Sequence, residues 1–198
     1  ARLGFGIWAA FVFAAAALPV VPLRFFPETP VWPAAALAVI TLGYPVVVLR
    51  HVWKRRQQAA LVAMGLGFAL FAAVLFGAYF PNATFMRLSP RAADVLIADG
   101  ATGDDVRMIG YTEQSLAFYQ GGGIDDLPNR FLLNTDISKW PGYLVVTRPI
   151  YDALPDEKRA ALDVLATLRG VNYAKGVKPM ELLVLRTRGG GTGVAAVD

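Results

Sequence analysis

The run from Gly110 to Tyr119 carries side chains that can bind a polar ligand. Tyr111 offers a ring that can stack on a sugar, and Glu113 and Ser115 offer a carboxylate and a hydroxyl. The run lies where a predicted strand passes into a predicted helix, which is where open α/β sheets place their ligands. The same residues also make an ordinary helix start, with Thr112 as the cap and an acid favoured by the helix dipole. Local chemistry leaves both interpretations open.

Other groups in the chain are weaker candidates for chemistry. The acidic pairs Asp104-Asp105 and Asp125-Asp126 can bind a metal or share a proton, but both lie in glycine-containing turns, so we expect solvated turn residues. The glycines at 121–123 lack the Lys and Ser/Thr of a phosphate-binding loop. Cysteine is absent and His51 is the only histidine, which excludes sites built from cysteine or several histidines. The sequence therefore predicts no metal site.

The elements that would position these groups are arranged around a basic turn at residues 50–56. It separates two long runs, 29–49 and 57–86, that contain no Asp, Glu, Lys or Arg. A short basic loop between two apolar spans is typical of the cytoplasmic side of a membrane. We therefore expect the spans to leave the cytoplasm in both directions and residues 81–188 to lie outside it.

Three membrane helices are predicted in a membrane region at 1–80, at about residues 3–23, 31–49 and 59–80. The 22 residues of the third reach roughly 33 Å as a helix, enough to cross a bilayer core. A signal peptide is the alternative for the first. The spans contain no ionisable residue away from their ends, which disfavours a channel or pump. The membrane region is interpreted as a scaffold.

The charge of the chain is unevenly distributed. The first 80 residues hold six basic residues and one acidic residue, whereas the remainder holds 13 basic and 14 acidic residues. The sequence pI near 9.5 thus reflects the membrane region. It gives no argument for nucleic acid as a partner.

Beyond residue 80 strand and helix patterns alternate, which predicts a small extracytoplasmic α/β domain with a mainly parallel sheet and a final antiparallel pair. The glycine-rich end predicts a flexible tail at 189–198. The expected strands are 106–110, 130–134, 143–147, 171–174 and 180–187, and the expected helices are 91–100 (capped at Ser89), 113–119 and 149–169, the last divided at Pro155.

Two motifs support a resemblance to a known family. They are GYxExSLxFY, beginning at Gly110, and GVNYxxG, beginning at Gly170. Together with membrane helices followed by an α/β domain, they resemble the carboxy-terminal end of bacterial GT-C membrane glycosyltransferases, in particular the protein-mannosyltransferase and aminoarabinose-transferase-like family. Gln114 stands where that family usually has proline.

The resemblance implies an inner-membrane, multi-pass enzyme that transfers a sugar from a polyprenyl-phosphate donor to a lipid or protein acceptor on the periplasmic face. The family's catalytic carboxylates lie in an early external loop that has no counterpart in this chain. The chain would therefore lack the catalytic residues. A divalent metal, if the enzyme uses one, would be bound in that missing catalytic part and not in this chain. Expected partners are the donor, membrane lipid and the remaining amino-terminal membrane helices. The substrate-binding residues implied are Tyr111, Glu113, Ser115, Asn172 and Tyr173.

The competing hypothesis is a complete, non-enzymatic protein with three spans. Its outer domain would bind a ligand or a partner protein, as a sensor or an envelope assembly module does.

Overall fold

The computed structural model describes residues 2–172 and 178–188. The chain divides into two compact units, Ala1–Thr84 and Phe85–Asp198. Tyr173 and the predicted tail at 189–198 lie outside the described residues.

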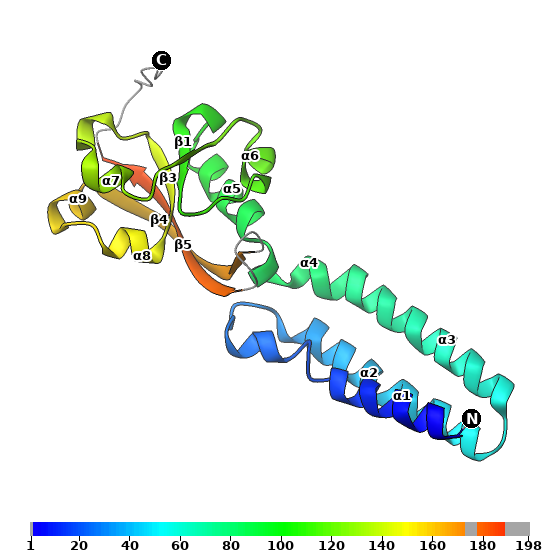
Figure 1. Cartoon of the computed structure of the whole chain (residues 1–198). Coiled ribbons are helices and arrows are strands. Elements are labelled where there is room, and N and C mark those ends of the chain that lie inside the picture. The colour runs from blue at the N-terminus through cyan, green and yellow to red at the C-terminus, as the bar shows by residue number, and fades with distance from the viewer. Residues whose placement is uncertain (1, 173–177, 189–198) are drawn as a thin grey trace. The chain divides into compact units, whose positions relative to one another are not determined.

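The first unit is helical (Figure 1). Two of its helices are long and apolar enough to cross a membrane, judged by length and composition: α2 and a continuous helix of 26 residues at Gln57–Asn82. The predicted spans at 31–49 and 59–80 lie inside them. The elements of this unit are α1 (Arg2–Ala15), η1 (Val21–Arg24), α2 (Val31–Trp53), α3 (Gln57–Val74), the π-helical turn η2 (Leu75–Tyr79) and α4 (Phe80–Asn82).

The first predicted span differs from the structure at its carboxyl end. We predicted one helix to residue 23, but α1 ends at Ala15 and the chain continues through turns to η1. Proline has no backbone N–H and its ring clashes with the carbonyl four residues earlier. Pro19 therefore ends the helix at Ala15. The 14 residues of α1 extend over roughly 21 Å, less than a bilayer core requires.

Helices α2 and α3 approach closely at Gly67. A Cβ atom at this position would lie 2.5 Å from Cδ2 of Tyr44 on α2, whereas at Gly65 and Gly77 it would meet nothing within 4 Å. Only Gly67 of these three is thus required by helix packing. Near the basic turn, Val48, Val52 and Ala60 form a small buried core.

The second unit contains a five-stranded sheet with the order β2-β1-β3-β5-β4. Strand β1 is parallel to β2 and β3, and β5 is antiparallel to β3 and β4. The predicted mixed α/β architecture is confirmed, with β5 as the single strand of opposite direction among the described ones. The strands are β1 (Val106–Ile109), β2 (Asp125–Leu127), β3 (Tyr143–Thr147), β4 (Leu162–Asn172) and β5 (Lys178–Thr187).

Helices cover both faces of this sheet (Figure 1). One apolar core lies under α5 (Leu88–Ala98) and α6 (Ser115–Gln120), and a second lies under α7, α8 and α9. Neighbouring residues of β5 alternate between them, because successive side chains of a strand point to opposite faces. The remaining elements are α7 (Phe131–Asn134), α8 (Arg148–Asp152), α9 (Asp156–Ala160), and the 3-10 turns η3 (Thr84–Met86), η4 (Gly103–Asp105) and η5 (Ile137–Lys139).

The predicted helix at 149–169 is wrong over its second half. Residues 162–172 form β4, which pairs with β5 along its whole length. A bulge between Val164 and Ala166 inserts one extra residue, so Leu162 faces the second core and Leu168 faces the first. This bulge disturbs the two-residue alternation of a strand, and the leucine spacing then resembles that of a helix. Only the short α8 and α9 are helical, separated near Pro155 as predicted.

Two further predictions in this unit are wrong. The predicted strand at 130–134 is the helix α7. Nζ of Lys158 donates hydrogen bonds to the carbonyls of Leu132 at 2.7 Å and Leu133 at 2.8 Å in this helix, and to the carbonyl of Thr135, just beyond it, at 3.0 Å. A distant cation thus stabilises a helix end that no local pattern reveals. Asp125 and Asp126 are exposed as predicted, but they begin the edge strand β2 and do not lie in a turn.

Candidate functional site

The candidate site lies at the carboxyl end of β1. The chain passes from β1 to β2 on one side and then returns to β3 on the other, so β1 and β3 form the switch point where open α/β sheets bind ligands. Gly110 follows β1 with a φ of 73°, in the left-handed region that glycine adopts without strain. This glycine turns the chain sharply into the segment that carries the predicted site residues.

Four side chains meet here and form what we call the hydroxyl–carboxylate cluster: Ser89, Tyr111, Glu113 and Ser115. Oε2 of Glu113 accepts hydrogen bonds from the Tyr111 hydroxyl at 2.9 Å and from Oγ of Ser89 at 3.1 Å. Oγ of Ser115 donates to Oγ of Ser89 at 2.7 Å and lies 3.5 Å from the same carboxylate oxygen. The structure thus brings together three of the five predicted residues.

Tyr111 reaches the cluster only through its hydroxyl group. Its side chain is 0% exposed and is packed in the first core. The predicted stacking of this ring on a sugar does not fit such burial. In the structure the Tyr111 hydroxyl holds the carboxylate of Glu113 in place. Glu113 is half-buried and Ser115 is exposed, so these two residues form the outer side of the cluster.

Sequence reasoning missed Ser89 as a member of the site. We predicted it as a helix cap, but the cap position is Arg87, and Ser89 is the second residue of α5. Its buried hydroxyl is directed to Tyr111, at 2.8 Å, and to Glu113. No local signal indicates this role, since the partners are more than 20 residues away.

Asn172 is the last residue of β4 and is 3% exposed. Because β4 runs in the same direction as β1, Asn172 lies at the same edge of the sheet as the cluster. The end of β4 also contacts α5 and η3. Nη1 of Arg91 in α5 donates to the carbonyl of Arg169 at 3.3 Å, and a Cβ on Gly170 would lie 2.5 Å from the carbonyl oxygen of Phe85 in η3. Tyr173, the fifth predicted residue, is not among the described ones.

An ionic group is located at the same edge, where β3 ends and β5 begins. Glu181 accepts hydrogen bonds from Nε of Arg148 at 2.9 Å and from Nε of Arg169 at 2.7 Å. These two guanidinium groups, Arg148 first, lower the pKa of the Glu181 carboxyl below its ordinary value. The group connects the start of α8 with β4 and β5.

Two exposed aromatic side chains lie on α6, the helix that begins at Ser115. Phe118 is 82% exposed and Tyr119 is 49% exposed, and their ring centroids are 5.5 Å apart. Large apolar side chains at such exposure are available for contact with a partner or a sugar ring. Sequence reasoning included them in the motif but assigned the aromatic role to Tyr111.

Comparison with known protein families, with curated proteins and with solved structures finds no match to this chain. No family is shown by these comparisons. The function of the chain is therefore inferred from its own residues.

The described residues contain no group of three or more His, Cys, Asp or Glu that could hold a metal ion. The acidic pairs have structural contacts instead. Asp105 accepts a hydrogen bond from Thr102 at 2.6 Å, and Asp125 lies 3.5 Å from Nε of Arg107. What the site offers chemically is a fixed carboxylate surrounded by hydroxyl groups, a set that can form hydrogen bonds with the polar groups of a ligand.

Proposed function

We propose that this chain is the carboxy-terminal part of a membrane glycosyltransferase that transfers a sugar from a polyprenyl-phosphate donor to a lipid or protein acceptor on the periplasmic face of a bacterial inner membrane. The observation that carries the proposal is the hydroxyl–carboxylate cluster at the carboxyl end of β1. Glu113 and Ser115 form its accessible side. Carboxylate and hydroxyl oxygens are the groups that recognise the hydroxyls of a sugar.

The role proposed for this part is binding and orientation of the donor head group or of the acceptor. Tyr111 and Ser89 fix the Glu113 carboxylate from the core side, which presets its direction before a ligand arrives. The catalytic carboxylate is proposed to lie in a part of the enzyme outside this chain. Glu28, the one acidic residue before position 81, is not assigned that role.

The proposed topology places the basic turn at 50–56 in the cytoplasm and the α/β unit in the periplasm. Two apolar helices, α2 and Gln57–Asn82, support a membrane hairpin by their length. The segment 2–24 is proposed as a third membrane segment. In this segment α1 and the turns that follow it, up to η1, would cross the membrane together. The basic residues favour the cytoplasmic side because they resist translocation.

Sugar-transfer assays on the intact enzyme test the role of the cluster. Glu113→Gln and Ser115→Ala remove a charge and a hydroxyl from its accessible side. A lost hydrogen bond to a charged group corresponds to roughly 10- to 100-fold weaker binding, so we expect the KM for donor or acceptor to rise by about that factor. Glu157→Gln, at an exposed position on α9, is the matched control. Full transfer activity in folded Glu113→Gln and Ser115→Ala variants would refute the site.

The absence of cysteine from the chain makes an orientation test simple. Single cysteines are introduced at Lys54, in the basic turn, and at Lys139, which is exposed in the α/β unit. In intact spheroplasts an impermeant maleimide should label Lys139→Cys and spare Lys54→Cys. The opposite pattern would show that the proposed topology is inverted.

The second candidate function is a membrane-anchored binding module without catalysis. The exposure of Phe118 favours it, because an aromatic ring that stands 82% in solvent suits a partner surface. Genomic DNA upstream of the codon for Ala1 separates the candidates. Further apolar spans and an acidic external loop support the enzyme, whereas a start codon closely preceded by a stop codon supports the binding module.

A further inference from the structure

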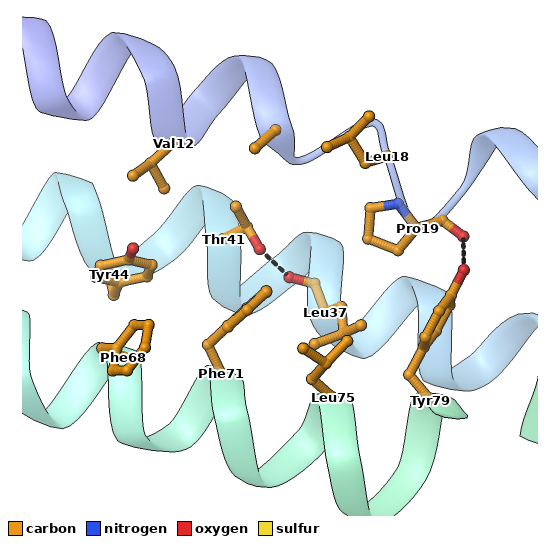
Figure 2. A pocket seen from close by; sticks show the side chains of 11 residues that line it. Val12, Leu18, Pro19, Leu37, Thr41, Tyr44, Phe68, Phe71, Leu75 and Tyr79 are labelled. Carbon is orange, nitrogen blue, oxygen red and sulfur yellow. Dashed lines mark hydrogen bonds between the residues drawn. The ribbon is translucent and has the colours of Figure 1, made fainter. Parts of the chain in front are cut away.

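The helical unit contains a cavity of about 400 Å³ between α1, α2 and the helix Gln57–Asn82 (Figure 2). This volume falls within the range of roughly 300–1,000 Å³ that is usual for small-molecule sites. Its walls are aliphatic and aromatic side chains from all three helices, among them Val12, Leu37 and Phe71. The cavity is therefore large enough for part of a ligand and belongs to one unit of the chain.

The lining offers little to a polar ligand. Among the described residues that line the cavity, none is acidic or basic. Oγ1 of Thr41 donates to the carbonyl of Leu37 at 2.6 Å, and the hydroxyl of Tyr79 donates to the carbonyl of Pro19 at 3.2 Å, as the dashed lines in Figure 2 show. Apolar cavities do not hold ordered water. The chemistry of the walls thus selects an apolar occupant.

The cavity is elongated along the helices. Its lining extends on one helix from Phe68 to Tyr79, which is roughly 16 Å at the helical rise. This matches the thickness of about 15 Å of one leaflet of a bilayer core. The π-helical turn Leu75–Tyr79 borders it, and such turns are frequent at functional sites. An extended chain fits this shape better than a compact ring system.

The basic residue that follows the Pro19 end of the cavity in the chain is Arg24. Pro19 and Tyr79 close the end that lies away from the basic turn, and Arg24 follows Pro19 by five residues, in the last turn of η1. Arg24 is exposed, and none of the ion pairs among the described residues includes it. A guanidinium group complements a phosphate head group.

We propose that the cavity binds one linear acyl chain of an anionic phospholipid, whose phosphate group pairs with Arg24. The proposal rests on the membrane insertion described above. It is independent of sugar transfer, because no residue of the hydroxyl–carboxylate cluster takes part in it. The lipid would fill space between α1 and the hairpin and so hold the three helices together.

Photo-crosslinking tests this site. The full chain is reconstituted in phosphatidylcholine vesicles that contain a minor fraction of phosphatidylglycerol with a diazirine on its linear acyl chain, and labelled peptides are mapped by mass spectrometry. Ala15→Phe fills the cavity, and Ala14→Phe, at an exposed position beside it, is the control. Arg24→Gln removes the proposed phosphate partner without altering the cavity.

In the wild-type chain we expect the label on Phe71 and Leu75. Labelling of these residues should fall roughly tenfold in Ala15→Phe and should be unchanged in Ala14→Phe. Arg24→Gln should abolish the preference for phosphatidylglycerol over labelled phosphatidylcholine. Even labelling of the outer faces of α2 and α3 would overturn the proposal, as would unchanged labelling in both Ala15→Phe and Arg24→Gln. Displacement of the label by equimolar polyprenyl phosphate would overturn the assignment to an acyl chain. Release of the wild-type chain by alkaline carbonate would instead refute the membrane insertion.

Discussion

The hydroxyl groups of Ser89 and Tyr111 lie 2.8 Å apart in the interior of the α/β unit, although 22 positions separate the residues. This contact joins the start of α5 to the segment after β1 and places two hydroxyls on the same carboxylate oxygen of Glu113. The candidate site is thus built into the core of the unit. Its integrity and the stability of the unit are coupled.

Tyr111→Phe should destabilise the chain while leaving the ring in place. The substitution removes one hydroxyl and leaves buried polar partners behind, which costs about 1–3 kcal/mol in the free energy of unfolding. Thermal unfolding of the detergent-purified chain, followed by near-UV circular dichroism, measures the change. Tyr119→Phe at the exposed position is the control, with an expected change below about 0.5 kcal/mol. Equal effects of the two variants would show that the buried hydroxyl contributes no more than an exposed one.

Gly170→Ala should be strongly destabilising. The new Cβ would lie 2.5 Å from the carbonyl oxygen of Phe85 in η3 and 2.6 Å from Cγ of Leu88 in α5, and the backbone oxygen cannot move aside without shifting η3. Overpacking of this kind costs about 1–3 kcal/mol. Gly123→Ala, where nothing lies within 4 Å, is the control. The same unfolding measurement should separate the two, and a neutral Gly170→Ala would mean that α5 is not in contact with β4 at this point.

Gly67→Leu should disrupt the pairing of α2 with α3. Its Cβ would clash with Tyr44, whereas Gly65→Leu adds a side chain in open space on the same helix. We expect a lower melting temperature in detergent for Gly67→Leu, by an amount that corresponds to about 1–3 kcal/mol, and little change for Gly65→Leu. Intrinsic tryptophan fluorescence follows the transition. If Gly65→Leu has the larger effect, the opposite face of the helix is the packed one.

The stability of the α/β unit should depend on pH through Glu181. Its folded pKa is lowered, chiefly by the hydrogen bond from Arg148. A carboxyl group with a lowered folded pKa contributes stability that is complete above its unfolded pKa of about 4.3 and is lost as the pH falls through the folded value. Glu181→Gln should remove this contribution. The difference in unfolding free energy between wild type and variant should therefore shrink as the pH is lowered from about 5.5 to 3. If the difference in unfolding free energy between wild type and Glu181→Gln stayed constant from about pH 5.5 to 3, the Arg148–Glu181 pair would be excluded as the source of that difference.

Several elements were predictable from the sequence because their signals are local. The strand β3 is a continuous apolar run, and α5 ends just before Gly100, whose φ of 82° suits a helix stop. The helices α2 and Gln57–Asn82 follow from long uncharged runs. In each case the decisive residues lie within the element or directly beside its end.

Other elements were mispredicted because their determinants are distant. The strand β4 exists because β5 pairs with it, and its bulge hides the alternation that would have revealed a strand. The helix α7 depends on Lys158, which is more than 20 residues away. Propensity and spacing within a window cannot report such partners.

The candidate site shows the same division. Its residue types, Tyr111, Glu113 and Ser115, and their place after a strand were determined by the sequence alone, since a motif and a strand-to-helix junction are local features. The tertiary structure decided that Ser89 joins them, that Tyr111 is buried and that Phe118 and Tyr119 are the exposed rings. Burial and hydrogen bonding between remote segments depend on how the helices pack on the sheet, and that packing is a property of the whole unit.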